Sequence, residues 1–418
     1  MIMRTLLLGA LCLPLSATAC TAFKITADGR TIVGNNEDAW SINARVRFEQ
    51  GRDGGYGAVY FGHFNGSPFR TMSDQIGMNE AGLVFDGLSI QQRTDAPRSL
   101  PGKKYMSFDE LMPLVMRTCA TVEESAALLS AYTMAQLVHS MLFLVDRNGG
   151  YLIVEDDTMM IGHDPTYAVG NWRMSTCTDP NAIPIPRLQA GRALLTSGSP
   201  GDPHHGLAVL SSMKACRKKL GEGTLFSTLF DPEKGLVRLY FYHDYTHAVL
   251  FDLEQELAKG DREMTMESLF PDNAEFLRLK SFVTPFHARW LYWLMLAWSI
   301  SALLLAAFSV VWLLRDVVRI VRRHPHASLL VPVLLGSSSG LAAGLFGVLL
   351  VMEGPYYSGL TDVHPALAWI PALLAVLVSG LVLLVLENRA PRWAATLCLA
   401  HHVPVLAALG YWGLLWPA

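Results

Sequence analysis

The residues Ala17-Thr18-Ala19-Cys20-Thr21-Ala22-Phe23 stand between a leader-like segment and the globular part of a chain of 418 residues. Before them come one cation, Arg4, and an apolar run from Leu6 to Leu15. This pattern is typical of a secretory signal peptide that ends in a small-x-small cleavage site, and the run is too short to cross a bilayer. We therefore predict that residues 1–19 are a signal peptide and that Cys20 begins the mature chain.

An N-terminal cysteine carries a nucleophile and a base on one residue. Its new α-amino group titrates at about 7.7–8.0 and can take the proton of the thiol. The alternative is a lipoprotein, in which Cys20 would carry lipid and its amine would be acylated, although Ala17 stands where such signals usually have Leu. A lipid adduct would exclude catalysis by Cys20.

The composition of the chain changes near Pro285. Residues before this point are mixed in character, whereas those after it are mostly apolar. Four apolar stretches are each long enough to cross about 30 Å of hydrocarbon, and they cover Trp290–Leu314, Leu329–Met352, Ala366–Leu386 and Ala394–Trp416. We predict a globular domain over residues 20–285 and an all-α membrane domain with four transmembrane helices over residues 286–418.

The positions of the cations predict the orientation of these helices. The segment Glu353–Pro365, between the second and third stretches, has no Lys or Arg. The loops after the first and third stretches hold several, namely Arg315, Arg319, Arg322, Arg323, Arg389 and Arg392. Because positive loops stay in the cytoplasm, the globular domain should face the periplasm or the extracellular side of the cytoplasmic (inner) membrane. The net charge of −3 gives no reason to expect nucleic acid as a partner.

The six cysteines sort by compartment. Cys12 would leave with the signal peptide, and Cys398 lies in the fourth apolar stretch. The remaining four share the oxidising side of the membrane, and they are Cys20, Cys119, Cys177 and Cys216. If Cys20 is free, the other three can form at most one disulfide. No Cys/His spacing suggests a metal site, and we expect no metal and no cofactor.

Strand and helix patterns in the globular part predict an α+β fold. Asp28-Gly29 is a hairpin turn between strands predicted at Thr21–Thr26 and Thr31–Gly34. Capping boxes that begin at Ser107 and Thr121 predict helices over 108–118 and 122–132. Further strands are predicted at Gly57–Phe61, Met141–Asp146, Tyr151–Glu155, Val237–Tyr242 and Ala248–Phe251, and a further helix at Leu253–Lys259. Strands come in hairpins and helices in runs, so the sheets should be mainly antiparallel.

Three ordered motifs in this part resemble the choloylglycine hydrolase family: Cys20-Thr21-Ala22-Phe23, Gly34-Asn35-Asn36-Glu37-Asp38 and Gly77-Met78-Asn79-Glu80-Ala81-Gly82-Leu83. This N-terminal-nucleophile group contains penicillin V acylases, bile salt hydrolases and linear-amide C–N hydrolases. The resemblance runs from Cys20 to about Gly260 and leaves the apolar stretches outside. It implies a four-layer αββα fold and hydrolysis of a linear amide by the N-terminal cysteine.

The resemblance also implies roles for individual residues. Cys20 would be the nucleophile, and Asp38 would lie near its amine and thiol. An amide carbonyl under attack develops negative charge on oxygen, so the site needs donors placed beforehand. Asn171, in Gly170-Asn171-Trp172, matches the family's oxyanion donor, and Ser89 matches the second donor.

Two departures from the family pattern concern the substrate. Asn35 stands where bile salt and penicillin V enzymes have an Arg, and a later family Arg has no match near Pro200-Gly201-Asp202. Fixed cations at the reacting centre are thus expected to be missing, which makes bile salts and penicillin V doubtful substrates. We predict Asn35 and Asn79 as substrate-binding residues, although Asn79 is also suited to shape the turn before Gly82.

Together these patterns predict a membrane-anchored amidohydrolase on the outer face of the membrane. Its substrate would be a small N-acyl amide, its other partner would be membrane lipid, and a homo-oligomer is compatible with the sequence. Two alternatives remain. One is a lipoprotein or catalytically silent sensor of an acyl compound, and the other is an acyltransferase that passes the acyl group to an amine.

Overall fold

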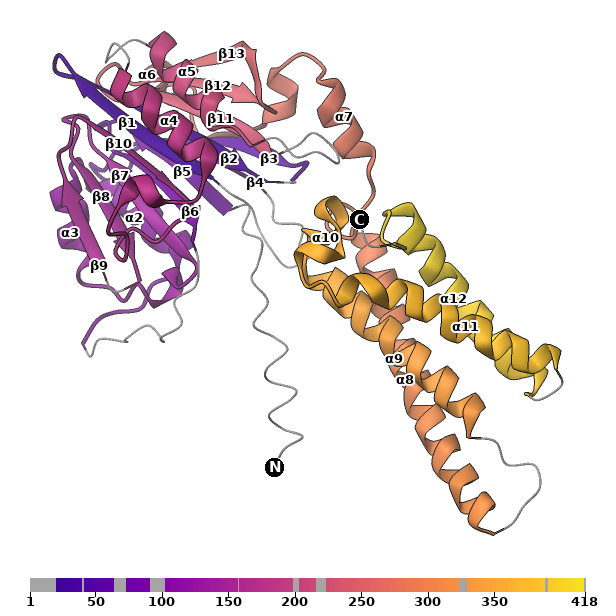
Figure 1. Ribbon diagram of the computed structural model, residues 1–418. Coiled ribbons are helices and arrows are strands. Elements are labelled where there is room, and N and C mark those ends of the chain that lie inside the picture. Colours follow the sequence, from indigo (N-terminus) through magenta and orange to yellow (C-terminus); the bar gives the residue numbers. More distant parts are fainter. Residues whose placement is uncertain are drawn as a thin grey trace. The chain divides into compact units, whose positions relative to one another are not determined.

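The computed structural model of the protein describes residues 20–39, 41–63, 73–90, 102–156, 158–197, 203–215, 223–322, 329–387 and 390–416. The predicted signal peptide lies outside these residues. The chain divides into two compact units, of which one ends at Phe282 and the other begins at Val283 (Figure 1).

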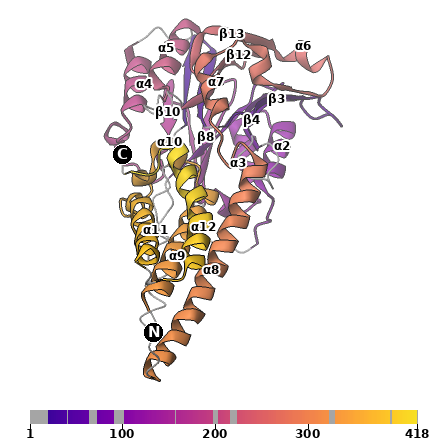
Figure 2. The ribbon, with the colours of Figure 1, turned by 90° about the vertical axis from the view of Figure 1, so that its right-hand side faces the viewer.

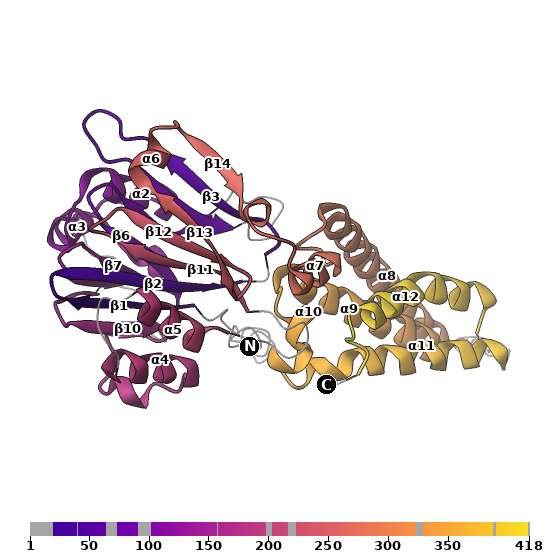
Figure 3. The same cartoon turned by 90° about the horizontal axis from the view of Figure 1, so that it is seen from above.

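The unit that ends at Phe282 is built on two antiparallel sheets (Figure 3). Among the described residues, the first has six strands, in the spatial order β10 (Thr166–Gly170), β1 (Thr21–Ala27), β2 (Arg30–Asp38), β11 (Thr224–Asp231), β12 (Leu236–Phe241) and β13 (Asp244–Asp252). In the same described part of the chain the second has eight, in the order β14 (Arg262–Thr265), β3 (Ala44–Glu49), β4 (Ala58–His63), β5 (Ser73–Asn79), β6 (Val84–Ser89), β7 (Ser140–Val145), β8 (Tyr151–Glu155) and β9 (Thr158–Gly162).

The start of β1 lies between two neighbouring strands. Thr21 is opposite Asn36 of β2 on one side and opposite Gly170 of β10 on the other. Because β2 and β10 both run antiparallel to β1, the end of β2 and the residue after β10 come next to Cys20. The register of three strands therefore gathers segments that are far apart in the sequence.

The strand β2 is longer than predicted. It was expected over Thr31–Gly34 but continues to Asp38, because the segment after Gly34 keeps pairing with both β1 and β11. Gly34 itself is explained by close packing, since an added Cβ would lie 2.3 Å from the ring of Phe23 on β1. The extension matters for the site, because successive side chains of a strand point to opposite faces of its sheet.

The two sheets pack face to face through buried aromatic rings. The ring of Phe61 on β4 lies 6.4 Å from Phe226 and 6.0 Å from Phe230 on β11, measured between centroids, and 6.5 Å from Phe251 on β13. All four rings are buried. Their removal from water stabilises the contact, at roughly 1.5–3 kcal/mol for each fully buried ring.

Helices cover the other face of each sheet (Figure 3). The first sheet is covered over β10, β2 and β11 by α4 (Pro186–Ser197) and α5 (Pro203–Met213). The second is covered over β5, β8 and β9 by α2 (Phe108–Thr118) and α3 (Val122–Leu129). The other helices in the described part of this unit are η1 (Ala135–Leu137), η2 (Pro180–Ala182), α6 (Leu253–Leu257), η3 (Met266–Leu269) and α7 (Ala274–Ser281).

Most differences from the predicted elements lie at their ends. The helices expected from capping boxes begin at Phe108 and Val122 as predicted, and Thr121 accepts a hydrogen bond from the N–H of Glu124 at 3.2 Å. The strand predicted at Val237–Tyr242 instead ends at Phe241. Tyr242 and His243 have φ of 50° and 46° and form a two-residue turn to β13, a backbone usually supplied by Asn or Gly.

The unit that begins at Val283 is helical (Figure 2). Among its described residues, four helices are long and apolar enough to cross a membrane, and they span Arg289–Val321, Leu330–Val351, Leu367–Leu386 and Arg392–Tyr411. The corresponding elements are α8 (Arg289–Val321), α9 (Leu330–Val351), η5 (Leu367–Trp369) with α11 (Ile370–Leu386), and α12 (Arg392–Tyr411). Two short helices, α10 (Pro355–Ser358) and η4 (Leu360–Asp362), lie between α9 and η5. Helix α9 packs against α8, α11 and α12. Each predicted apolar stretch overlaps one of these helices, and the fourth, Ala394–Trp416, extends beyond the end of α12 at Tyr411.

Candidate active site

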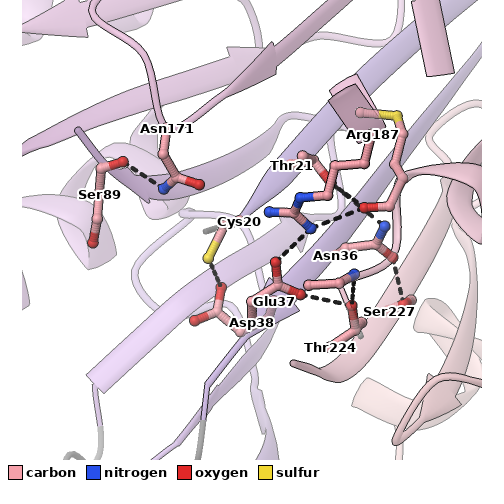
Figure 4. Close-up of polar contacts among 12 residues, drawn as sticks. Cys20, Thr21, Asn36, Glu37, Asp38, Ser89, Asn171, Arg187, Thr224 and Ser227 are labelled. Atoms are coloured by element: carbon pink, nitrogen blue, oxygen red, sulfur yellow. Dashed lines mark hydrogen bonds and ion pairs between the residues drawn. The ribbon is translucent and has the colours of Figure 1, made fainter. Parts of the chain in front are cut away.

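Cys20 immediately precedes β1, and its side chain is buried, with 3% of the residue exposed. Its Sγ donates a hydrogen bond to Oε2 of Glu37 at 3.3 Å. The backbone amide of Asp38 also hydrogen-bonds the sulfur. The thiol thus lies against the last two residues of β2 (Figure 4).

One face of β2 looks toward the second sheet. From this face Asn35 donates to Oδ2 of Asp86, on β6, at 2.6 Å. Glu37 places Oε1 3.1 Å from Nε2 of His63, on β4. Among the described residues, Oδ1 of Asn35 and Oδ1 of Asp86 have no hydrogen-bond partner. The pair therefore retains capacity for a further polar group.

The opposite face of β2 looks toward α4 and α5. Asn36 donates to the carbonyl of Leu210 on α5 at 3.0 Å and accepts from the hydroxyl of Ser227 at 2.6 Å. Asp38 accepts from the hydroxyl of Thr224 at 2.6 Å. The motif Gly34-Asn35-Asn36-Glu37-Asp38 therefore sends its side chains alternately between the sheets and under the helices.

Arg187 supplies the positive charge beside Asp38. Its Nη1 lies 2.6 Å from Oδ2 of Asp38 and donates to the carbonyl of Met213 at 2.9 Å. The Asp38 side chain is fully buried, so its charge would be costly without this partner. The departures from the family pattern predicted no fixed cation at the reacting centre, and Arg187 shows that this expectation was wrong. The segment around Arg187 carries no motif, so no sequence signal marked it.

The two predicted oxyanion donors lie together on one side of Cys20, with Asp38, Arg187 and Thr224 on the other (Figure 4). Asn171 follows the end of β10, and its Nδ2 donates to the backbone carbonyl of Ser89 at 2.5 Å. This contact uses the carbonyl of Ser89 and not its hydroxyl. Ser89 as a hydrogen-bond donor to substrate stays a prediction.

Asn79 makes its contacts with a helix and a turn. Its Nδ2 donates to the carbonyls of Met116 and Cys119 at 2.7 and 2.8 Å, at the end of α2, and its Oδ1 accepts from the N–H of Leu83 at 2.9 Å. Gly82, in the same turn, has a φ of 83°. These contacts are those of a residue that shapes a turn, and its predicted binding of substrate stays a prediction.

The electrostatic environment keeps a proton on the thiol. Burial raises the pKa of the Cys20 thiol well above its ordinary value, and the carboxylates of Glu37, Asp38 and Asp86 raise it further. Burial likewise raises the pKa of Asp86 well above its ordinary value, and the charge of Glu37 adds to the effect. A nucleophilic Cys20 therefore needs a base close to its sulfur.

Glu37, His63, Asp86 and Arg187 belong to this site, and the sequence did not predict them as functional residues. Glu37 stands inside the second motif, so the motif itself was a signal for it. The other three come from elements that the motifs do not cover. In the described part of the chain no group of three or more His, Cys, Asp or Glu side chains is placed to hold a metal ion. Cys119 and Cys177 are free thiols, and Cys216 lies outside the described residues.

No protein-family model and no curated protein matches this chain. It is similar in structure to two variants of conjugated bile acid hydrolase from Clostridium perfringens, each with 14% sequence identity over 61% of this chain and 97% of the other, at TM-scores of 0.46 and 0.45. It is also similar to penicillin V acylase from Agrobacterium tumefaciens, with 18% identity over 57% of this chain and 89% of the other, at a TM-score of 0.41. The likeness concerns the two antiparallel sheets, and a helical region follows them here.

Proposed function

We propose that the protein is an N-terminal-nucleophile amidohydrolase of the αββα class, which cleaves the linear amide of an N-acyl compound. The observation that carries the proposal is the placement of Cys20. It precedes the first strand of a sheet, with its sulfur against Glu37 and the amide of Asp38. The motif resemblance described above assigns the nucleophile and the nearby carboxylate to the same two positions, Cys20 and Asp38.

The residues around the thiol suit acyl transfer. After cleavage behind Ala19, the α-amine of Cys20 takes the thiol proton while Sγ attacks the carbonyl carbon of the amide. The proton passes to the nitrogen of the leaving amine as the C–N bond breaks, which leaves a thioester on Cys20. Water then attacks the thioester, its proton returns to the thiol by the same base, and a carboxylic acid leaves.

Asn171 supplies the oxyanion donor in this scheme. Its amide has two N–H groups, and one of them is bonded to the carbonyl of Ser89. That bond fixes the orientation of the amide plane before substrate arrives. A donor held in advance stabilises the tetrahedral oxyanion more than the ground-state carbonyl.

The four apolar helices anchor this domain to the cytoplasmic membrane, on the side away from the positive loops. An anchored site meets substrates that gather at the bilayer surface. Lipid-like N-acyl amides, N-acylated amino acids and acyl-homoserine lactones are therefore the compounds to test first.

The proposal is tested with the full-length protein in detergent. Intact-mass analysis should show an unmodified Cys20 at the N-terminus, whereas a diacylglyceryl adduct would indicate the lipoprotein alternative. A panel of N-acyl amides of different chain length should then yield free acid and amine, and rapid quenching should trap an acyl adduct on Cys20. Cys20→Ala should form no adduct. A Cys20→Ala variant that hydrolyses at the wild-type rate would show that another residue is the nucleophile.

The acyltransferase alternative is separated in the same assay. An added amine acceptor diverts the acyl group into a new amide if transfer is the natural reaction. Free acid as the main product at high acceptor concentration supports hydrolysis.

A further inference from the structure

A continuous line of buried polar contacts joins Cys20 to an imidazole on the other sheet. Sγ of Cys20 donates to Oε2 of Glu37 at 3.3 Å, and Oε1 of the same carboxylate lies 3.1 Å from Nε2 of His63. The three residues are between 3% and 7% exposed. Glu37 thus touches the reacting atom with one oxygen and a positioning side chain with the other.

The fold explains why this carboxylate faces the thiol. Glu37 and Asp38 are neighbours on β2, so their side chains leave opposite faces of the sheet. Asp38 goes to the helix side, where Arg187 and Thr224 hold it. Glu37 goes to the space between the sheets, where its contacts are with the thiol and with His63 of β4.

The hydrogen-bond roles follow from the chemistry of the groups. A carboxylate oxygen can only accept, so Nε2 of His63 carries the hydrogen in its contact with Glu37. Among the described residues, Nδ1 of His63 has no hydrogen-bond partner. The imidazole can therefore hold Glu37 in place in its neutral form and can also take up a second proton at Nδ1 without losing that contact.

We propose that Glu37 is a catalytic proton acceptor for the Cys20 thiol and that His63 positions its carboxylate. The inference rests on the proposed function for the identity of the nucleophile, and it assigns to Glu37 the proton transfers that were given there to the α-amine. In the acylation step the thiol proton moves from Sγ to Oε2 while the new S–C bond forms. The protonated carboxyl then gives this proton to the leaving nitrogen as the C–N bond breaks. In the second half Glu37 takes a proton from the attacking water and returns it to the thiolate as the S–C bond breaks, so the site ends unchanged.

A Glu37 that accepts the proton and a Glu37 that acts only through its negative charge predict opposite effects of its removal on the reactivity of Cys20. If the α-amine is the only base, the negative charge of Glu37 merely opposes the thiolate, and its removal should make Cys20 more reactive. If Glu37 takes the proton, its removal should make Cys20 less reactive at neutral pH. Asp86 provides the matched control, because it is another buried carboxylate whose charge acts on Cys20 and its side chain bonds to Asn35 instead.

The test measures alkylation of Cys20 by iodoacetamide against pH, in the full-length protein, and requires no substrate. The modified fraction is read from the mass of the peptide that contains Cys20, so the other cysteines do not interfere. The charged groups around the thiol and its partners are the α-amine of mature Cys20, Glu37, Asp38, Asp86, His63 and Arg187. Wild type should show a plateau near neutral pH, where thiol and carboxyl share one proton, followed by a second rise at higher pH.

Glu37→Gln should lose this plateau and react about 10²-fold more slowly at neutral pH, whereas Asp86→Asn should keep the plateau and react faster. Glu37→Asp, which withdraws the carboxylate but keeps its charge, should also be slowed. His63→Gln should keep a plateau but shift the pH at which it begins, which loss of packing alone would not do. The melting temperature of each variant is measured in parallel, and Glu37→Asp serves if Glu37→Gln does not fold.

Two results would overturn the inference. One is faster alkylation of both Glu37→Gln and Asp86→Asn, which would leave the amine as the base. The other is a wild-type profile with a single rise at high pH. Both differ from failure of the proposed function, in which Cys20 alkylates as described but no acyl adduct forms with any N-acyl amide.

Discussion

Oδ2 of Asp38 lies 2.6 Å from Nη1 of Arg187, and this ion pair joins the end of β2 to α4 across the helix-covered face of the first sheet. Asp38 is fully buried and Arg187 is largely so. The contact therefore compensates a charge that would otherwise oppose folding. It also ties the position of α4 to the strand end that touches the nucleophile.

Replacement of Arg187 by Met should remove the cation that lies against the buried carboxylate of Asp38. We expect a loss of about 3–5 kcal/mol in stability and a fall in kcat, because the backbone amide of Asp38 contacts the thiol. Arg187→Lys should recover part of both, since a lysine keeps the charge but not the second contact with Met213. Melting temperature and acyl-enzyme formation measure the two effects. An Arg187→Met protein with wild-type melting temperature and kcat would contradict this role.

Replacement of Asn171 by Ala should lower kcat by about 10²–10³ and change KM little, because an oxyanion donor acts mainly in the transition state. Single-turnover acylation separates the two parameters. Asn171→Asp is the matched control, since it keeps the size of the side chain but faces the carbonyl of Ser89 with an acceptor. Unchanged kcat with a raised KM would instead mark Asn171 as a residue that binds substrate.

Replacement of Asp86 by Asn should stabilise the protein at neutral pH and have little effect in acid. Burial raises the pKa of this carboxyl in the folded protein. A carboxyl whose pKa is higher in the folded than in the unfolded protein contributes its full stability only below its unfolded pKa, which is about 3.9 for Asp. This contribution to the free energy of unfolding is lost as the pH rises through the folded pKa. Asn can still accept the hydrogen bond from Asn35. The difference in melting temperature between variant and wild type should therefore grow with pH, and a constant difference would contradict the assignment.

Replacement of Asn79 by Ala should destabilise the protein without changing KM. The side chain makes three buried hydrogen bonds to the backbone, and loss of each satisfied group costs about 1–3 kcal/mol. We expect a total loss of at least about 2 kcal/mol, visible as a lower melting temperature. A protein of unchanged melting temperature but raised KM would support the substrate contact predicted from the sequence.

Much of the fold follows from local patterns. The four long helices beyond Val283 were predicted because apolar runs of that length are a property of the sequence alone. The starts of α2 and α3 were predicted because a capping box needs only residues three apart. The hairpin of β1 and β2 was predicted from Asp28-Gly29, whose two residues both adopt positive φ. Strands such as β3, β6 and β11 carried no such local signal and were not predicted.

The candidate site also has a part that local sequence predicts and a part that it does not. The sequence by itself determined that Cys20 stands at the head of a strand, because the hairpin turn at Asp28-Gly29 pairs residues that are close in the chain. The continuation of the next strand from Gly34 to Asp38 depends on its pairing with both β1 and β11. Only the tertiary structure decided which groups surround Cys20 and Asp38. Arg187 arrives on a helix 149 residues after Asp38, and His63 and Asp86 arrive on the opposite sheet. Their contacts depend on strand register, on the alternation of side chains along β2 and on the packing of one sheet against the other, and none of these is a property of a local stretch of sequence.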